Sequence, residues 1–267
     1  MKHFRSNKGF QATAHKLSLC DRLRTLQSYT VLPVGRRLNP DVRQMKMKRK
    51  CIFAILLPLL AGCVGTDRPL HDAVSCGDIQ AVETLVDGGA NINAKGMYGR
   101  TPLYYAALCG QSEAVAYLLA KGANPKIGAS WKDNNTPLHV AAEHGDLACV
   151  QILVNNGVPV DIRNSSKQTP LLLAAEFLHP TIVKYLLDHG AKVDAPDRKG
   201  NTPLYWSTCS GEGYATSDEA GVSVVQILLE HGANPNVKGV RGTPLAWAVN
   251  GGHHEIEKSL REHGAKE

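Results

Sequence analysis

The sequence predicts an all-α repeat solenoid of about six stacked helix-turn-helix units. Thr-Pro-Leu recurs at intervals of 35, 33, 33 and 41 residues, and a degenerate copy, Arg68-Pro69-Leu70-His71, lies 33 residues before the first full copy. A pair of small residues follows most copies, and Gly-Ala closes most units about 21 residues after the Thr. Self-similarity at this period is the signature of a repeat architecture. The full copies begin at Thr101, Thr136, Thr169, Thr202 and Thr243.

Each position of the unit has a physical reason. Thr is suited to cap a helix by accepting a backbone N–H, and Pro directly after it fits the first helical turn. The second helix carries an apolar stripe at helical spacing, as in Val115, Leu118 and Leu119. Gly is then expected to end that helix in a left-handed conformation. Because one unit cannot bury its stripe alone, neighbouring units must stack.

These motifs resemble the ankyrin repeat, and the resemblance covers residues 68–265. It implies that each unit is a pair of antiparallel helices followed by a β-hairpin-like loop. The last helix, Glu255 to Glu262, is charged enough to face solvent as a cap. We expect the repeats at about 68–100, 101–135, 136–168, 169–201, 202–242 and 243–265.

The resemblance also implies where a partner would bind, because ankyrin-family proteins use their loop tips and the inner face of their first helices. Tyr105, Trp206 and Trp247, four residues after a Thr, have packing as an equal alternative. The partner-binding residues expected are Tyr98, Arg100, Tyr105, Leu108, Trp131, Lys132, Asp133, Glu143, His144, Gln168, Glu176, Phe177, Lys199, Trp206, Tyr214 and Trp247.

Two irregularities interrupt the period. The step of 41 reflects about nine residues inserted between the helices of the fifth repeat, around Ser210 to Glu219, which include Tyr214. The step of 35 reflects two extra residues in the loop from Pro125 to Asn135, which carries Trp131. Insertions in repeat proteins map to loops and are often functional, but long surface loops are also tolerated at little entropic cost.

The N-terminal part indicates a secretory leader. Four bases precede a short apolar run from Cys51 to Gly62, too short to span a bilayer as a helix. The run ends in Leu60-Ala61-Gly62-Cys63, which resembles a bacterial lipobox. We therefore expect a signal peptide at 45–62, a lipidated Cys63, a tether at 63–67, and translation that begins at Met45 or Met47 rather than Met1, with 1–44 upstream of the mature protein or disordered. The alternative is a cytoplasmic protein with a disordered basic arm.

Charge argues against a nucleic-acid partner. Residues 1–62 hold 13 Lys and Arg against two acids, so the remainder holds 17 bases against 22 acids. A mildly acidic body is expected to lack the basic stripe that a phosphate binder needs.

The sequence also leads us to expect that the protein binds no metal, no cofactor and no small-molecule substrate. No phosphate loop, nucleophile elbow or zinc-binding spacing is present in the sequence, and the period of the repeat accounts for most histidines. Cys76 and Cys109 hold equivalent positions in adjacent repeats. Stacked helices about 8–10 Å apart place them beyond disulfide reach, so reduced thiols are expected, and a bridge between the two would require the backbone to shift.

The function expected is a protein-binding scaffold, lipid-anchored at the outer membrane and facing the periplasm. The residue after Cys63 is Val64 rather than Asp, and in lipoproteins of this type that favours the outer membrane. The scaffold would act as an adaptor or as an immunity-type inhibitor. The alternatives are a structural envelope protein, or an enzyme with Tyr214, Asp218 and Glu219 of the fifth-repeat insertion as its candidate site.

Overall fold

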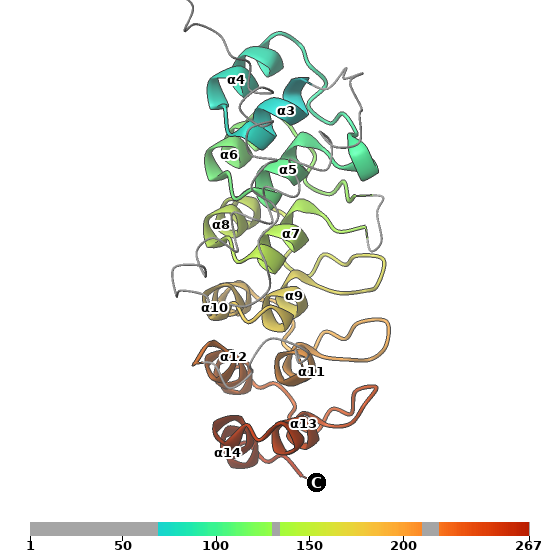
Figure 1. The fold of residues 1–267 in the computed structure, drawn as a ribbon, viewed down its shortest axis with the longest axis vertical. Coiled ribbons are helices and arrows are strands. Elements are labelled where there is room, and N and C mark those ends of the chain that lie inside the picture. Colours follow the sequence, from blue (N-terminus) through green and yellow to red (C-terminus); the bar gives the residue numbers. More distant parts are fainter. Residues whose placement is uncertain (1–68, 130–133, 210–218, 267) are drawn as a thin grey trace, which may run out of the picture. The chain divides into compact units, whose positions relative to one another are not determined.

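The computed structural model describes residues 69–129, 134–209 and 219–266. Within them the chain forms six consecutive pairs of helices, stacked in chain order (Figure 1). The first helices of the pairs are α3 (Pro69–Cys76), α5 (Pro102–Leu108), α7 (Pro137–His144), α9 (Pro170–Glu176), α11 (Pro203–Cys209) and α13 (Pro244–Gly251). The second helices are α4 (Ile79–Asp87), α6 (Ser112–Ala120), α8 (Leu147–Asn155), α10 (Pro180–Asp188), α12 (Glu219–Glu230) and α14 (His254–Glu262). The predicted all-α solenoid is confirmed.

The predicted caps form at the start of the first helices. The hydroxyl of Thr101 accepts a hydrogen bond from the backbone N–H of Tyr104 over 3.2 Å, and Thr169, Thr202 and Thr243 make the same contact. At the other end of each unit, Gly122 has a φ of 88°, and its neighbour Ala123 donates a backbone hydrogen bond to Leu118. The chain thereby leaves the second helix and enters the loop.

The core runs along the stack between the first and the second helices. Small residues of the first helices, such as Ala106, Ala141 and Ala174, are fully buried, so the helix pairs pack closely. The apolar stripe of the second helices is buried at Val115, Leu118 and their equivalents, while Leu119 is half-buried at its edge. On α14, Ile256 and Leu260 are buried and five charged or imidazole side chains are exposed, as expected of a cap: His254, Glu255, Lys258, Arg261 and Glu262.

The loops between repeats turn back as predicted, but no strand forms among the described residues, apart from an isolated bridge between Gly239 and Gly242. The two arms of each loop are joined by single backbone hydrogen bonds, such as Gly96 N–H to Arg100 O (2.7 Å) and Asp197 N–H to Asn201 O (3.0 Å). The arms are too short to continue the ladder. A short 3₁₀ helix, η2 (Met97–Gly99), lies within the first loop.

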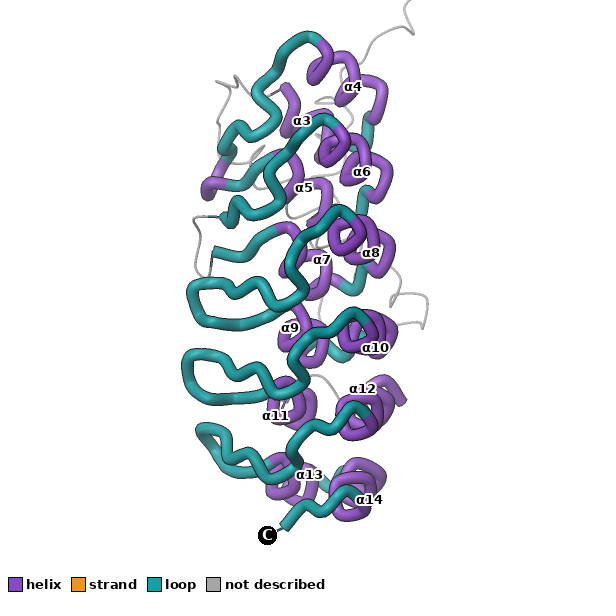
Figure 2. The backbone as a smooth tube through the Cα atoms, turned by 180° about the vertical axis from the view of Figure 1, so that it is seen from behind, coloured by secondary structure: helices purple, strands orange, loops and turns teal. Residues whose placement is uncertain are grey.

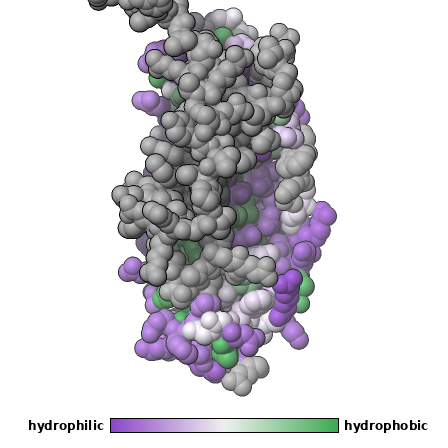
Figure 3. Space-filling view, viewed as in Figure 1, coloured by the Kyte–Doolittle hydropathy of each residue, from purple (hydrophilic) through white to green (hydrophobic). Residues whose placement is uncertain are grey.

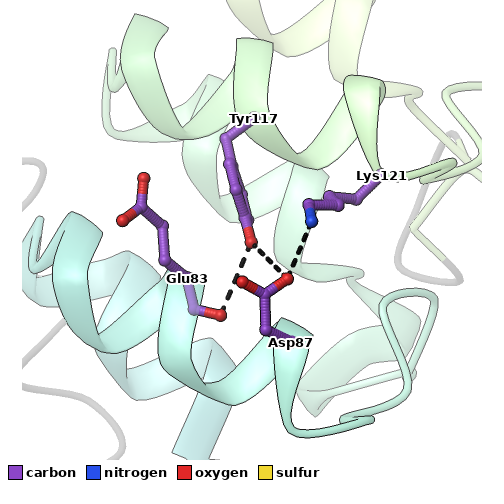
Figure 4. A network of polar contacts seen from close by, with 4 residues as sticks. All are labelled: Glu83, Asp87, Tyr117 and Lys121. Carbon is purple, nitrogen blue, oxygen red and sulfur yellow. Dashed lines mark hydrogen bonds and ion pairs between the residues drawn. The ribbon is translucent and has the colours of Figure 1, made fainter.

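Polar contacts on the outer side join successive second helices. Asp87, the last residue of α4, accepts hydrogen bonds from Tyr117 Oη (3.1 Å) and Lys121 Nζ (2.8 Å) of the next repeat, and Tyr117 also reaches the Glu83 carbonyl (Figure 4). The Lys121 ammonium, and then the Tyr117 hydroxyl, hold the pKa of the Asp87 carboxyl below its usual range. In the fourth repeat, Asp188 is the last residue of α10, as Asp87 is the last residue of α4. Its Oδ1 lies 3.5 Å from Nε2 of His231, which directly follows α12 of the next repeat.

The insertion of the fifth repeat is partly absorbed by a longer helix. α12 has 12 residues, whereas every other second helix has nine. The three extra residues begin at Glu219, and residues 210–218 lie outside the described residues.

Candidate protein-binding surface

The inter-repeat loops lie in one column beside the first helices (Figure 2). We call the segments 93–100, 126–135, 161–168, 194–201 and 236–242 the first to fifth hairpin loops; residues 130–133 of the second lie outside the described part. Figure 3 shows mostly hydrophilic residues along the edge where the loops of the C-terminal repeats lie. The loops and the adjacent first helices therefore form the surface on which the predicted partner-binding residues were placed.

Neighbouring hairpin loops are bound to one another by side chains. Asn164 Nδ2 of the third loop donates to Asn135 Oδ1 of the second over 2.7 Å. Arg163 Nη1 donates to the Pro196 carbonyl of the fourth loop over 3.0 Å, and Asn201 Oδ1 of that loop accepts from the Val240 N–H of the fifth over 3.0 Å. Side chains thus join the second to fifth loops into one connected platform.

Buried carboxamide and carboxylate groups shape individual loops. In the fourth loop Asp197, 8% exposed, accepts hydrogen bonds from the backbone N–H groups of Lys199 (2.7 Å) and Asn201 (2.9 Å). Asn164 does the same in the third loop, accepting from Ser166 and Gln168. Such Asx contacts replace the backbone pairing that a tight turn leaves unmade.

His139 joins α7 to the third hairpin loop. Its Nδ1 lies 3.3 Å from the backbone N–H of Thr136 and its Nε2 lies 3.1 Å from the Gln168 carbonyl. An N–H can only donate and a carbonyl can only accept, so the neutral ring carries its proton on Nε2. Desolvation in this buried site lowers the pKa of His139 to about 4. These contacts give His139 a structural role in the stack.

Several predicted partner-binding residues lie on the candidate surface with part of their side chain accessible. Tyr98, 37% exposed, and the exposed Lys199 stand on hairpin loops. The half-buried residues are Leu108, Glu143, His144, Glu176 and Trp247 on the first helices, Phe177 directly after α9, and Arg100 and Gln168 at the loop bases. The last turns of successive first helices thus expose a pair of residues at equivalent positions.

Arg100 is more enclosed than the prediction assumed. Its guanidinium carbon lies 5.4, 5.2 and 5.7 Å from the ring centroids of Tyr98, Tyr104 and Tyr105, within cation–π range. The aromatic rings hold this arginine at the base of the first loop and orient it.

For Tyr105 and Trp206 the structure supports the packing alternative. Tyr105 is only 8% exposed, and its ring meets His71 edge-on at a centroid distance of 5.8 Å, so little of it is left for a partner. Trp206 is half-buried, and its indole N–H donates to Asp197 Oδ2 over 3.1 Å. Trp131, Lys132, Asp133, Tyr214 and the lipidation residue Cys63 lie outside the described residues.

The expectation that the body lacks a basic stripe was wrong. Over their described residues the hairpin loops carry nine bases and three acids, and none of the nine is buried. The average over the chain concealed this, because acids on the second helices cancel these charges. Alignment of the sequence by repeat would have found the signal. The bases, which we call the basic loop edge, are Lys95, Arg100, Lys126, Arg163, Lys167, Arg198, Lys199, Lys238 and Arg241.

The chemistry available elsewhere in the described residues is limited. They contain no cluster of three potential metal ligands, and none of their helices has the length and apolar character needed to cross a bilayer. Cys76, Cys109, Cys149 and Cys209 form no disulfide with one another. Burial raises the pKa of the Cys149 and Cys209 thiols, which disfavours the reactive thiolate. Of the candidate catalytic residues, Glu219 is exposed at the start of α12, whereas Asp218 lies outside the described part.

Comparison with known proteins agrees with this architecture. A family model described as ankyrin repeats (3 copies) matches residues 48–129, 70–164 and 138–239. No curated protein matches the chain.

Solved structures provide two informative neighbours. An ankyrin repeat domain from Acinetobacter baumannii AYE is 29% identical, with a TM-score of 0.67, and the match covers 75% of this chain and all of that one. The ankyrin repeat domain of Bcl-3, an IκB-family protein, is also 29% identical, with a TM-score of 0.63, covering 75% of this chain and 87% of that one. With six helix pairs and their caps, loops and core at the family's spacing, the chain belongs to the ankyrin-repeat family.

Proposed function

We propose that the protein is a membrane-tethered scaffold that holds another protein in the bacterial envelope. Ankyrin repeats generally bind protein partners, which supports the scaffold part of the proposal. The observation that carries it is the repetition of partly exposed side chains at equivalent positions at the ends of consecutive first helices. Examples are Glu143 and His144 at the end of α7, and Glu176 at the end of α9 with Phe177 directly after it. Repetition on one face, beside the platform of loops, provides an extended surface rather than a closed pocket.

The tether is proposed from the sequence. The basic segment, the apolar run and Leu60-Ala61-Gly62-Cys63 together favour lipidation of Cys63, and Val64 favours the outer membrane over the inner. Five residues separate Cys63 from the first helix, which begins at Pro69, and they reach about 17 Å when fully extended. The scaffold would then act within a short distance of the membrane, as an adaptor or as an immunity-type inhibitor of an envelope-acting toxin.

Site-specific photo-crosslinking tests the binding surface. In one variant a benzophenone amino acid replaces Phe177 on the proposed surface, and in the other it replaces Gln226, which is exposed on α12. Both variants are made in the full-length chain, expressed in bacteria so that it can reach the envelope. We expect a discrete crosslinked protein with the probe at Phe177 and none with the probe at Gln226. Equal crosslinking from both positions, or none from either, would exclude this surface as the binding site.

Lipidation is tested separately. Metabolic labelling with a palmitate analogue should mark the full-length chain, and the Cys63→Ser variant should lose both the label and its association with the membrane fraction. A labelled Cys63→Ser variant, or an unlabelled parent chain, would refute the tether without affecting the binding surface.

A further inference from the structure

The described part of the repeat domain separates its charges between two sides. The hairpin loops carry nine bases and three acids, whereas the second helices α4, α6, α8, α10, α12 and α14 carry nine acids and three bases. The acids of the second helices are Glu83, Asp87, Glu113, Asp188, Glu219, Glu230, Glu255, Glu257 and Glu262, and all except the half-buried Glu257 are exposed. A chain whose overall body is mildly acidic therefore presents one positive edge.

The three acids of the loops are outnumbered by the nine bases, and their oxygens already accept hydrogen bonds from the protein itself. Asp161 accepts from the backbone N–H of Lys192 over 3.1 Å, and Asp194 accepts from that of Asn234 with both oxygens. Asp197 is buried and accepts from its own loop and from Trp206. By contrast, none of the nine bases forms an ion pair with an acid of the described residues.

Arginine side chains hold part of the edge in a fixed arrangement. Arg163 Nη1 donates to Pro196 O over 3.0 Å, and Arg198 donates in the opposite direction, from Nη2 to Ser165 O over 2.6 Å and from its backbone N–H to Ser166 O over 2.8 Å. The third and fourth loops are therefore cross-linked. Preorganisation of this kind lowers the entropy cost of binding.

The distance between successive hairpin loops determines which ligand the basic loop edge can bind. Successive repeats bring equivalent loops about 10 Å apart, the spacing of packed helices. An extended peptide in the polyproline II conformation has three residues per turn and advances about 3.1 Å per residue, so every third side chain points to the same side and would reach the next loop. We propose that the basic loop edge binds an extended acidic segment of the partner protein, with Asp or Glu at about every third position. This inference rests on the proposed function and specifies the chemistry of the partner.

The ends of the first helices, which we call the floor of the surface, favour a peptide over a nucleic acid as the ligand of the basic loop edge. Glu143 and Glu176 are half-buried at equivalent positions of α7 and α9, on the first helices that lie beside the loops. A floor carboxylate thus lies near the positive edge. The dense, uniform negative charge of a phosphate backbone would be repelled by Glu176 and by Glu143, its equivalent in the preceding repeat. A peptide can direct its acids toward the loops and its neutral or basic residues toward the floor.

Two double variants of the full-length chain test the proposal. Lys199→Glu with Lys238→Glu reverses two exposed lysines of adjacent loops, whereas Lys184→Glu with Lys258→Glu reverses two exposed lysines of the second helices and changes the net charge equally. The probe is a fluorescent 15-residue peptide of Gly, Ser and Ala with Glu at every third position, measured by anisotropy at low and at physiological salt. Duplex DNA and vesicles containing anionic phospholipid are measured in parallel.

We expect the peptide to bind the parent chain in a salt-dependent manner. Affinity should fall at least tenfold in the loop variant and by less than about twofold in the second-helix variant. Equal losses in both variants, no binding to the parent, or tighter binding of DNA or vesicles than of the peptide would overturn the proposal. If the peptide fails while the Phe177 probe still captures a protein, only this inference fails; if both fail, the proposed function fails as well.

Discussion

The indole N–H of Trp206 donates a hydrogen bond to Asp197 Oδ2 over 3.1 Å, joining the first helix of the fifth repeat to the hairpin loop that precedes it. Asp197 also accepts from Lys199 and Asn201. The tryptophan is therefore the fixed point that attaches the buried carboxylate, and with it the fourth loop, to the stack.

Replacing Trp206 by Phe should weaken this attachment. The variant keeps an aromatic ring but removes the donor, and loss of a hydrogen bond to a charged group reduces the free energy of unfolding by about 1–3 kcal/mol. Trp247→Phe is the matched control, since the side-chain partner of its indole N–H is the neutral Tyr205 hydroxyl rather than a carboxylate. Urea denaturation followed by circular dichroism measures both. Equal losses would mean that the Asp197 contact contributes nothing beyond ring packing.

Gly239 in the fifth loop should not tolerate a side chain. A Cβ at this position would overlap the ring of Tyr205, which is 2% exposed and cannot move into solvent. Gly239→Ala is expected to cost about 1–3 kcal/mol of unfolding free energy, the usual range for overpacking. In a Tyr205→Leu background the same substitution should cost less, because the ring is gone. Additive losses in the double variant would argue against the clash.

Most of the fold could be predicted from the sequence, because each repeat encodes a cap, a pair of small residues, an apolar stripe and a Gly at fixed spacing. For example, Thr101 caps a helix, Leu118 is buried, and Gly122 adopts a left-handed conformation, each at the position that the repeat pattern predicts. The pattern works because each unit contacts only its neighbours, so local signals determine the global architecture.

The site was predicted less completely, because the missing information lies between repeats. Exposed aromatics were assigned to partner binding by their position, but whether Trp206 is accessible depends on Asp197, nine residues earlier in the preceding loop. The positive edge was missed because net charge averages over both sides of the molecule. Arg163, Arg198 and Arg241 acquire a common role only when the loops are brought into one column.

Lys121 should control the ionisation of Asp87 across the first repeat junction. Because the ammonium is the first cause of the lowered pKa of Asp87, Lys121→Gln should raise that pKa toward the ordinary value for an aspartate. Lys184→Gln removes an ammonium that pairs with Asp188 instead, and should leave the pKa of Asp87 unchanged. Carbon-detected NMR titration of the side-chain carboxyl measures it. An unchanged pKa in the Lys121 variant would show that the ion pair does not persist in solution.

Stability should fall in mild acid because of His139. Its pKa is about 4 in the folded chain against 6.5 for the free side chain, so below pH 6.5 the unfolded state binds a proton that the folded state excludes. Stability therefore rises with pH across this window and is lost progressively as pH falls from about 6.5 to about 4, by about 3 kcal/mol in total from this residue.

His139→Gln isolates that contribution from the carboxylates, which titrate in an overlapping range. The variant loses the bridging hydrogen bonds and is less stable at pH 7, but the difference in its denaturation midpoint between pH 7 and pH 4.5 should be smaller than in the parent chain. His254→Gln, at an exposed position on α14, should keep the parent's difference. If the His139 variant showed the same pH difference as the parent, the imidazole would have to be protonated without cost in the folded chain. That result would contradict the lowered pKa, which follows first from burial of the ring and is supported by the Thr136 N–H, a donor that faces Nδ1.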